Sequence, residues 1–278
     1  MPELPEVEVC RRGIEPELLA QPILGVAIRA PRLRLPIPPE LAEWLPGCCI
    51  AAVRRRGKYL LLDCRRADGS GGTLIIHLGM SGHLRFVAPG DPVGRHDHFD
   101  LCLPGRILRL SDPRRFGVVT WQPGAPEDSA RHPLLAVQGV EPLSPEFTVD
   151  WLESVFSRRA SPVKPVLMDS HLLVGVGNIY ASESLFRAGI SPLRAANRIA
   201  RGRLATLVQA VQETLSEAIA AGGSSIRDYV HSDGSSGWFQ IQAAVYDRDG
   251  QPCRRCAGLV RQVRQAGRST YYCPGCQR

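Results

Sequence analysis

The sequence predicts an α+β protein with more than one domain, and three observations support this fold class. Short apolar runs separated by turn residues fill the first half of the chain. After about residue 148, apolar residues instead recur at helical spacing. Near the C-terminus, two Cys-x-x-Cys pairs mark a small module of their own. With 278 residues, 44% of them hydrophobic, the chain can build more than one core.

The first element is a helix predicted over residues 3 to 19. Leu4, Val7, Ile14 and Leu18 recur at the spacing of one helix face. The alternation that follows has a different period, so the helix is expected to end before the first strand.

Pro2 gives this helix start a second interpretation. A small second residue normally permits removal of Met1, which leaves Pro2 as a free secondary amine. Its pKa of about 8 keeps much of it unprotonated at neutral pH, so it can attack an aldehyde carbon. Glu3 and Glu6 follow on one helix face. The alternative is an ordinary helix start, with proline in the first turn and acids that complement the helix dipole.

The next part of the chain predicts a β-sandwich or barrel. Its apolar runs are too short for helices and are separated by turn residues. The runs are Ile23–Ile28, Ile50–Val53, Tyr59–Cys64, Thr73–Leu78, His83–Val87, Phe99–Leu103, Ile107–Leu110 and Phe116–Trp121. From Gln122 to about Pro145 the composition shifts to Pro, Gly, Glu and His, as in a linker. We therefore expect an N-terminal domain at residues 1–130 and a linker at 131–147.

The second half predicts helices and then a small terminal module. The helices are expected at Val149–Phe156, Pro162–Met168, Asn178–Ala188 and residues 195–221, with Gly222 and Gly223 ending the last one. A polar stretch rich in Gly and Ser follows at residues 222–237, and a strand-like run at Phe239–Tyr246. The expected domains are residues 148–238 and residues 239–278.

Four of the nine cysteines predict a structural zinc site. Cys253-x-x-Cys256 and Cys273-x-x-Cys276 have the spacing of two zinc knuckles, and four protein ligands leave no open position on the metal. A redox role for the Cys-x-x-Cys pairs is the alternative. The other cysteines are expected as inert core thiols, and an odd total argues against a disulfide framework.

The charge pattern favours a polyanionic partner. The chain carries a net charge of +7, and residues 253–278 contain several arginines and no acid. Among the 34 basic residues only Lys58 and Lys164 are lysines, which can titrate when buried whereas arginine cannot. No apolar run approaches a membrane span, and the polar start is no signal peptide, so a soluble cytoplasmic protein is expected.

Three turns carry residues suited to binding nucleic acid. Gly175–Asn178 enters a helix, where backbone N–H groups bind phosphate, although a helical hairpin is an equally good interpretation. Asp112–Phe116 places arginines beside an aromatic ring, and the turn at His77–Gly82 offers Met80. An apolar wedge with an arginine can part a base stack, whereas core packing is the alternative for Met80 and Phe116. Arg268 follows a predicted hairpin turn, where it can grip phosphate or remain a solvated surface residue.

These motifs resemble, in order, those of the bacterial formamidopyrimidine-DNA glycosylase (8-oxoguanine DNA glycosylase) family. The resemblance covers essentially the whole chain. It rests on Pro2–Glu8, Lys58–Leu61, His77–Gly82, Asp112–Gly117, Gly175–Glu183 and the four cysteines. It implies an N-terminal β-sandwich with the terminal helix, a helix–two-turn–helix domain and a C-terminal four-cysteine zinc finger. DNA is expected to lie between the domains.

The implied activity is that of a bifunctional DNA glycosylase and abasic-site lyase of base excision repair. Such an enzyme flips and excises oxidised purines through a Schiff base on its N-terminal proline, then nicks the strand by β,δ-elimination. The expected partner is double-stranded DNA with oxidised purines or abasic sites. The resemblance further implies one structural zinc ion, no redox or nucleotide cofactor, no membrane association, a monomer, and a cytoplasmic location in a bacterium, at the nucleoid.

The family's catalytic roles fall on residues already singled out. Pro2 resembles the nucleophile that attacks C1′, Glu3 the acid/base group at the opened sugar, and Glu6 a supporting carboxylate. Lys58 matches a lysine used in β-elimination. Arg268 matches the finger arginine associated with δ-elimination; because arginine is a poor proton donor, we expect it to position phosphate.

The implied DNA contacts lie in both halves of the chain. Backbone contacts are expected from His96, Arg114, Arg159 and Asn178, and Lys164 aligns with a family lysine near the DNA. Met80, Arg114 and Phe116 resemble the triad that fills the space left by the flipped base, with Arg114 facing the opposite cytosine. The lesion-recognition loop is expected at residues 222–237 and includes Ser224, Ser225, Arg227 and Tyr229. Arg227 and Trp238 depart from the family pattern, where lysine and tyrosine are common.

Two other function classes are distinguishable by experiment. A sister class resembling endonuclease VIII excises oxidised pyrimidines, but typically has glycine where this chain has Leu4. Preference for thymine glycol over 8-oxoguanine would identify that class. A non-catalytic zinc-ribbon protein would form no covalent adduct with lesion DNA on addition of borohydride.

Overall fold

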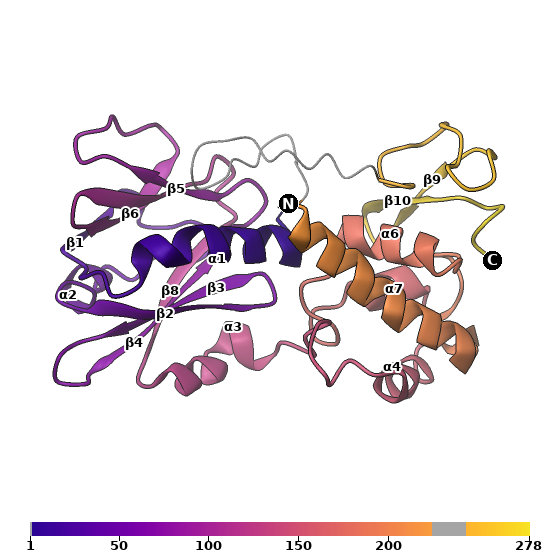
Figure 1. Cartoon of the computed structure of the whole chain (residues 1–278), viewed down its shortest axis with the longest axis horizontal. Coiled ribbons are helices and arrows are strands. Elements are labelled where there is room, and N and C mark those ends of the chain that lie inside the picture. The colour runs from indigo at the N-terminus through magenta and orange to yellow at the C-terminus, as the bar shows by residue number, and fades with distance from the viewer. Residues whose placement is uncertain (1, 224–242) are drawn as a thin grey trace. The chain divides into compact units, whose positions relative to one another are not determined.

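The computed structural model describes residues 2–223 and 243–278, which form two compact units (Figure 1). Of these residues, the first unit takes Pro2, residues 6–136 and residues 222–223. The second takes Glu3–Pro5, Val137–Ala221 and residues 243–278. Pro2 and Glu3 are therefore adjacent in sequence but belong to different units. The domain limits expected from the sequence stay predictions.

The first unit confirms the predicted β-sandwich and its terminal helix, α1 (Leu4–Leu18). It contains two four-stranded sheets whose neighbouring strands all pair antiparallel. One sheet has the order β1 (Gly25–Ile28), β6 (Asp97–Leu103), β7 (Arg106–Ser111), β5 (His83–Val87). The other has the order β2 (Cys49–Arg56), β3 (Tyr59–Arg65), β4 (Gly71–His77), β8 (Val118–Pro123). Short helices α2 (Leu41–Trp44), η1 (Pro126–Arg131) and α3 (Pro133–Ala136) complete it.

One hydrophobic core joins α1 to both sheets. Val7 and Ile14 of α1 pack in the same buried cluster as Leu60 of β3 and Phe99 of β6. Strand alternation explains this, because every second residue of β3 faces that core while Leu61 packs in a separate cluster beneath α3. Removing apolar surface from water stabilises the unit by roughly 25 cal/mol per Å². The core fixes α1, and with it the start of the chain.

The thiols of the first unit differ from expectation at two positions. Cys10, Cys48 and Cys64 are buried, as predicted, but Cys49 is exposed and Cys102 is half-buried. Cys48 and Cys49 adjoin at the start of β2, where neighbouring side chains point to opposite faces. One of the pair therefore faces solvent.

The second unit is helical and carries the finger. Its elements are α4 (Val149–Phe156), α5 (Val163–Leu167), α6 (Asn178–Arg187), η2 (Ala196–Arg198), α7 (Arg201–Ala220), β9 (Arg261–Gln265) and β10 (Arg268–Tyr272). Gly222, in the left-handed region with φ +85°, follows the end of α7, as the sequence predicts. Phe186 of α6 packs into the core of the finger beside Val260 and Tyr271. No helix in the described part of the chain is long and apolar enough to cross a membrane.

The predicted strand at Phe239–Tyr246 is wrong for its described part. Residues 243–246 form bends and the start of a turn. The Glu183 carboxylate of α6 accepts hydrogen bonds from the backbone N–H groups of Ala244 (2.8 Å), Val245 (3.0 Å) and Tyr246 (2.8 Å). Amides held by one carboxylate cannot also pair with a neighbouring strand.

Candidate functional site

Glu3 is bound to the start of helix α6 within the second unit. Its carboxylate accepts hydrogen bonds from the backbone N–H groups of Gly177 (2.7 Å), Ile179 (3.0 Å) and Tyr180 (3.4 Å), and the residue is 2% exposed. These amides have no partner within the helix, and the helix dipole favours an anion there. Glu3 therefore occupies three of the amides that the phosphate interpretation of this glycine turn would use, and phosphate contact by Asn178 stays a prediction.

The glycines of this turn are required by the approach of the N-terminal residues. A Cβ on Gly177 would lie 2.3 Å from the Glu3 carboxyl carbon, and one on Gly175 would lie 2.6 Å from the Leu4 side chain. The backbone N–H of Leu4 also donates to the Gly175 carbonyl (3.0 Å). The residue directly after Pro2 is thus held by both side-chain and backbone contacts. Pro2 itself is buried, and Met1 lies outside the described residues.

Lys58 sits in a two-residue hairpin turn of the first unit. Arg56 pairs with Tyr59 across the turn, and Gly57 adopts φ +54°, which glycine tolerates without strain. The Arg55 guanidinium donates to the Gly57 carbonyl (3.0 Å) and to Glu8 of α1 (3.1 Å). This link ties the turn that carries Lys58 to the helix that begins the chain.

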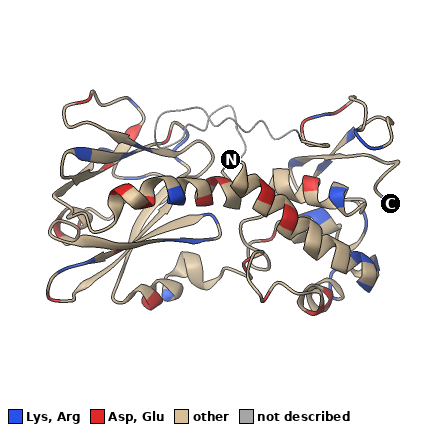
Figure 2. Cartoon of the chain, in the orientation of Figure 1, with Lys and Arg blue, Asp and Glu red and all other residues tan. Residues whose placement is uncertain are grey.

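Glu8 is the centre of that link. Its carboxylate also accepts hydrogen bonds from Arg11 (3.1 Å) and Arg12 (2.9 Å). Both acidic and basic residues lie along α1 (Figure 2). Burial acts to raise the pKa of Glu8, but hydrogen bonds from Arg11 and Arg12 and the charge of Arg55 together hold it below its ordinary value.

A neutral histidine lies close to the same turn. Burial, with smaller contributions from Lys58 and Arg34, lowers the pKa of His77 to about 4. Its Nδ1 accepts a hydrogen bond from the Gly79 backbone N–H (2.9 Å), and its ring lies 4.7 Å from that of Tyr59. His77 therefore acts at neutral pH as an uncharged acceptor that holds the start of the Met80 turn.

Met80, Arg114 and Phe116 lie on two turns of the first unit. Phe116 is 44% exposed, Arg114 is exposed and Met80 is half-buried, so core packing is excluded for Phe116. The Arg114 guanidinium carbon lies 5.0 Å from the centre of the Phe116 ring. An exposed ring with a cation over it is suited to contact with the faces of bases.

Lys164 is the second lysine and lies in the second unit. Its ammonium donates to Asn178 Oδ1 (2.6 Å), Thr270 Oγ1 (2.8 Å) and the Ser269 carbonyl (3.2 Å), and the residue is 1% exposed. We call these four residues the lysine cluster. Burial, aided by the charge of Arg268 and opposed by that of Glu3, lowers the pKa of Lys164 to about 8.

The lysine cluster borders a small hollow that Arg268 also lines. The hollow has a volume of about 180 Å³. Arg268 follows the two-residue turn of the β9–β10 hairpin, as predicted, and is exposed. Tyr246 hydrogen-bonds to Asn178 and packs against Tyr271 at 5.2 Å between ring centres. The finger, helix α6 and residue 246 thus meet around Asn178.

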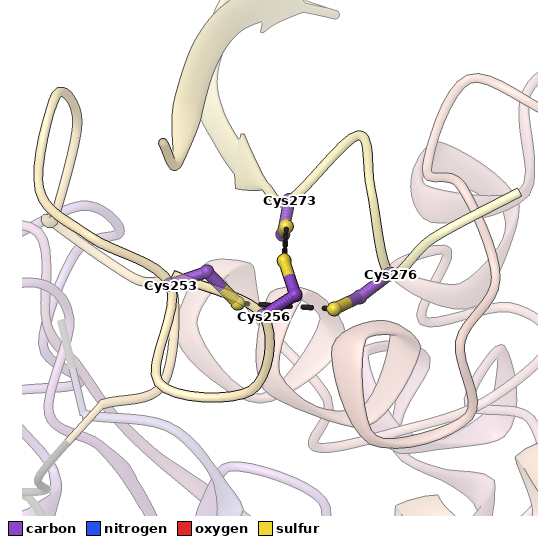
Figure 3. Close-up of side chains that lie close together, drawn as sticks. All are labelled: Cys253, Cys256, Cys273 and Cys276. Atoms are coloured by element: carbon purple, nitrogen blue, oxygen red, sulfur yellow. Dashed lines mark hydrogen bonds between the residues drawn. The ribbon is translucent and has the colours of Figure 1, made fainter. Parts of the chain in front are cut away.

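The four finger cysteines fit one zinc ion (Figure 3). Their sulfur atoms all lie within 4.8 Å of one another, with 3.8 Å between Cys253 and Cys276 and 3.5 Å between Cys256 and Cys273. Tetrahedral zinc thiolate bonds of about 2.3 Å require sulfur atoms ~3.8 Å apart. Burial acts to raise the pKa of Cys253, but backbone N–H donors lower it to about 7, which favours the thiolate. Among the described residues, this is the only cluster suited to a metal.

Comparison with known proteins now decides the family. Residues 1–119 match the formamidopyrimidine-DNA glycosylase N-terminal domain, residues 138–230 its H2TH domain, and residues 250–278 a zinc finger found in FPG and IleRS. Formamidopyrimidine-DNA glycosylases of Dechloromonas aromatica and Thiobacillus denitrificans are 72% and 52% identical to the chain, each over all of both chains. The chain belongs to the formamidopyrimidine-DNA glycosylase family.

Solved structures of the family agree with the fold. The crystal structure of MutM (Fpg) from Thermus thermophilus is 39% identical, covers 99% of this chain and 98% of its own, and has a TM-score of 0.87. Lactococcus lactis Fpg in complex with DNA containing an abasic site is 32% identical, covers 99% of both chains, and has a TM-score of 0.90. The predicted fold class and the single structural zinc are confirmed at the family level.

The remaining predicted site residues divide by burial. His96 and Arg159 are exposed, whereas Glu6 is fully buried and Asn178 is half-buried. His96 and His98 do not lie on the same exposed face, because His98 is only 2% exposed. The lesion-loop residues Ser224, Ser225, Arg227 and Tyr229 lie outside the described residues, as does Trp238. The roles of all these residues stay predictions.

Sequence reasoning missed several residues that hold the turns of the candidate site in place. They are Glu8 and Arg55 at the Lys58 turn, Ser81 and Asp112 at the two exposed turns, and Glu183 at residues 244–246. Only Asp112 left a usable signal, since an Asp that begins a turn commonly accepts hydrogen bonds from amides further along the turn.

Proposed function

We propose that the chain excises oxidised purines, 8-oxoguanine and formamidopyrimidines, from double-stranded DNA and then nicks the strand through a Schiff base on Pro2. Membership of the formamidopyrimidine-DNA glycosylase family supports the glycosylase and base-excision-repair role. The observation that carries the mechanism is the hold on Glu3. A buried carboxylate fixed by three backbone donors directly follows Pro2, whose amine would be free once Met1 is removed, and it would serve as a preorganised acid/base group.

The proposed reaction begins at the Pro2 nitrogen. It attacks C1′ as the bond to the damaged base breaks, and the base leaves with a proton. The amine then loses its proton, and the C1′–O4′ bond breaks as O4′ takes up a proton, which opens the sugar and leaves an iminium at C1′. Glu3 exchanges protons at the opened sugar, and Glu6 supports it. Loss of a proton from C2′ expels the 3′-phosphate, and loss of one from C4′ expels the 5′-phosphate. We assign Lys58 to the first elimination and Arg268 to positioning phosphate in the second.

DNA binding is proposed to use both units. The net charge of +7 favours the duplex, and contacts from His96, Arg114, Arg159 and Asn178 would bind its backbone without sequence preference. A base inside the stack cannot be reached, so it must be flipped at a cost of a few kcal/mol. The exposed Phe116 ring, with Met80 and Arg114, would offset that cost by filling the space left in the stack. Lys164 would supply positive charge beside Arg268.

The zinc ion holds the finger and takes no part in the proposed chemistry. Its four ligands leave no position for water or substrate. The finger supplies β10, and thereby Arg268 and two members of the lysine cluster. Cytoplasmic location and a monomeric state remain predictions from the sequence.

Excision assays on matched duplexes test this function. We expect release of 8-oxoguanine opposite cytosine to exceed release of thymine glycol by at least about 100-fold in kcat/KM, which corresponds to about 2.7 kcal/mol. Preference for thymine glycol would instead place the chain with the endonuclease VIII-like class.

Two variants test the role of Pro2. Pro2→Gly keeps a free amine but loses the secondary amine, so we expect slower excision. A chain that retains Met1 should be inactive, because the Pro2 nitrogen is then part of a peptide bond. Thr148→Ala, which removes the N-cap of α4 and none of the predicted site residues, serves as the matched control. Full activity of the Met1-retaining chain would exclude Pro2 as the nucleophile.

A further inference from the structure

Asp112 is a buried acid to which the proposed mechanism gives no role. It lies between β7 and β8 and is 0% exposed. Its backbone is held on both sides. Its N–H donates to the His96 carbonyl (2.9 Å), and its carbonyl accepts from the Arg115 N–H (3.2 Å). His98 Nε2 also lies 2.9 Å from that carbonyl, and since a carbonyl only accepts, His98 must carry its proton on Nε2. The position of Asp112 is therefore fixed before its side chain is considered.

The Asp112 side chain joins the two turns that carry Met80, Arg114 and Phe116. Its Oδ1 accepts hydrogen bonds from the Ser81 hydroxyl (3.0 Å) and the Arg114 backbone N–H (3.3 Å). Its Oδ2 accepts from the Gly117 backbone N–H (2.7 Å). We call Asp112, Ser81, Arg114 and Gly117 the turn cluster. One carboxylate thus fixes the residue after Met80 and the residues at each end of the Arg114–Phe116 segment.

Backbone packing leaves these turns little freedom. A Cβ on Gly79 would lie 2.5 Å from the Gly117 nitrogen and from the Phe116 carbonyl carbon, so the two turns are in direct contact. Arg115 adopts φ +55°, in a region that residues other than glycine rarely occupy. Such a conformation persists only where the surroundings hold it, and residues of this kind cluster at functional sites.

The partners of Asp112 differ from those of comparable acids in the same unit. Asp100 forms a two-hydrogen-bond pair with Arg109, and Asp63 forms one with Arg54. The hydrogen bonds described for Asp112 come instead from backbone amides and one hydroxyl. A buried anion without a cation is costly unless it is fully hydrogen-bonded. A carboxylate can accept all three bonds at once, whereas an asparagine has only one acceptor oxygen.

We propose that Asp112 is a positioning residue that sets the spacing of Met80 from Arg114 and Phe116, and so determines how strictly excision requires cytosine opposite the damaged base. This inference rests on the proposed function, in which these three side chains fill the space left by the flipped base. Arg114 would face the opposite base, so any displacement of its turn changes the contacts that distinguish cytosine from adenine. Ser81 is the second positioning residue, because its hydroxyl lies between Asp112 and the Arg114 backbone (3.3 Å).

The test compares 8-oxoguanine excision opposite cytosine and opposite adenine. For Asp112→Asn we expect the ratio of the two kcat/KM values to fall by about tenfold. For Ser81→Ala, which removes one hydrogen bond and leaves the carboxylate, we expect a fall of about threefold. Borohydride trapping on abasic-site DNA, which reports on Pro2, should stay within about twofold of wild type in both variants.

Asp63→Asn is the matched control. Asp63 is 2% exposed in the same sandwich. It accepts hydrogen bonds from Arg54 and Thr73, neither of which belongs to the two turns. It should lower thermal stability without changing the cytosine-to-adenine ratio. An equal fall of that ratio in Asp63→Asn would show general destabilisation and overturn the proposal.

A double-mutant cycle separates positioning from a structural role. In an Arg114→Ala background, where discrimination is already lost, adding Asp112→Asn should change the ratio no further. An independent, additive effect would contradict positioning through Arg114, as would an unchanged ratio in folded Asp112→Asn and Ser81→Ala. Failure of the proposed function itself is distinguishable, because wild type would then show no excision or no adduct in the same assays.

Discussion

The turn cluster of the first unit and the lysine cluster of the second are built on the same plan with opposite charge. Asp112 is buried and accepts from neutral donors, and Lys164 is buried and donates to neutral acceptors. The partners of Asp112 all lie on turns of one β-sandwich. Those of Lys164 come from α6 and from β10 of the zinc finger. The hydrogen-bond partners of a buried charged side chain can therefore come from turns of its own domain, as for Asp112. They can instead come from a zinc finger whose fold depends on its metal, as for Lys164.

Removal of zinc should break this comparison most strongly. Without the metal, the four cysteine sulfurs no longer bind a common ion, and β10 is no longer held in place. The lysine cluster then loses Ser269 and Thr270, which lie on β10. We expect affinity for abasic-site duplex to fall by about 100-fold or more, because Arg268 is displaced as well. Titration with a chelator, followed by fluorescence anisotropy, measures this.

The first unit provides the control for zinc removal. Its strands and turn cluster contain no metal ligand, so amide exchange at Gly117 should stay protected. Unchanged DNA affinity in the metal-free chain, or loss of protection at Gly117, would show that the two clusters are not independent.

Comparison of Lys164→Met with wild type at different pH values tests how much stability the burial of the Lys164 ammonium costs. Below about pH 8 the lysine is protonated in folded and unfolded chains, and its burial costs stability. Between pH 8 and about 10.4 the folded chain releases the proton first, so the stability that Lys164 contributes rises with pH. Relative to Lys164→Met, wild type should gain on the order of 2 kcal/mol over that range.

Urea unfolding at a series of pH values, with zinc saturated, checks this shift. Lys164→Arg is the matched variant, since it stays charged throughout and should show no such rise. A constant difference between wild type and Lys164→Met from pH 7 to pH 10.5 would mean that Lys164 does not change protonation there.

An ion pair of the first unit gives a smaller reference effect. Glu8→Gln weakens the bonds from Arg11, Arg12 and Arg55, so we expect a loss of about 1–2 kcal/mol at neutral pH. The pKa of Glu8 is held below its ordinary value, so this stability is present above about pH 4.3 and is lost as pH falls further. Thermal unfolding at pH 7 and pH 3.5 measures it, and an equal difference at both values would refute the ion-pair origin.

The smallest effect is expected at a neutral contact away from both clusters. Thr148 caps α4 by accepting a hydrogen bond from the Trp151 backbone N–H (3.1 Å). Thr148→Ala should cost about 1 kcal/mol of stability, measured by urea unfolding. Excision and zinc affinity should be unchanged, and a change in either would link α4 to the site.

The sequence predicted the elements well because apolar periodicity records burial directly. The helix at Val149–Phe156 and the strand at His83–Val87 have the bounds expected from their apolar residues. The zinc site was equally predictable, because the spacing of the two Cys-x-x-Cys pairs alone indicates four sulfur ligands for one metal ion. These features depend on residues close together in sequence or on a repeating pattern.

The parts that could not be predicted depend on hydrogen bonds to the backbone. Glu3 binds amides more than 170 residues away, and no pattern in either segment marks the pair. Asp112, Ser81 and Glu183 likewise bind backbone amides or turn residues. Every residue except proline carries a backbone amide, so the sequence does not mark which amides are bound. The predicted strand at residues 243–246 is wrong for this reason, because Glu183 takes the amides that a strand would use.

The most direct measurement is to map the covalent adduct formed when borohydride is added to the chain on abasic-site duplex. Reduction of an iminium fixes the DNA to the amine that formed it, and mass spectrometry of peptides identifies that amine. The chain offers three amines, the N-terminal Pro2, Lys58 and Lys164, once Met1 is removed. We expect one adduct, on Pro2, in chains that lack Met1. An adduct on either lysine, or none, would contradict the proposed mechanism.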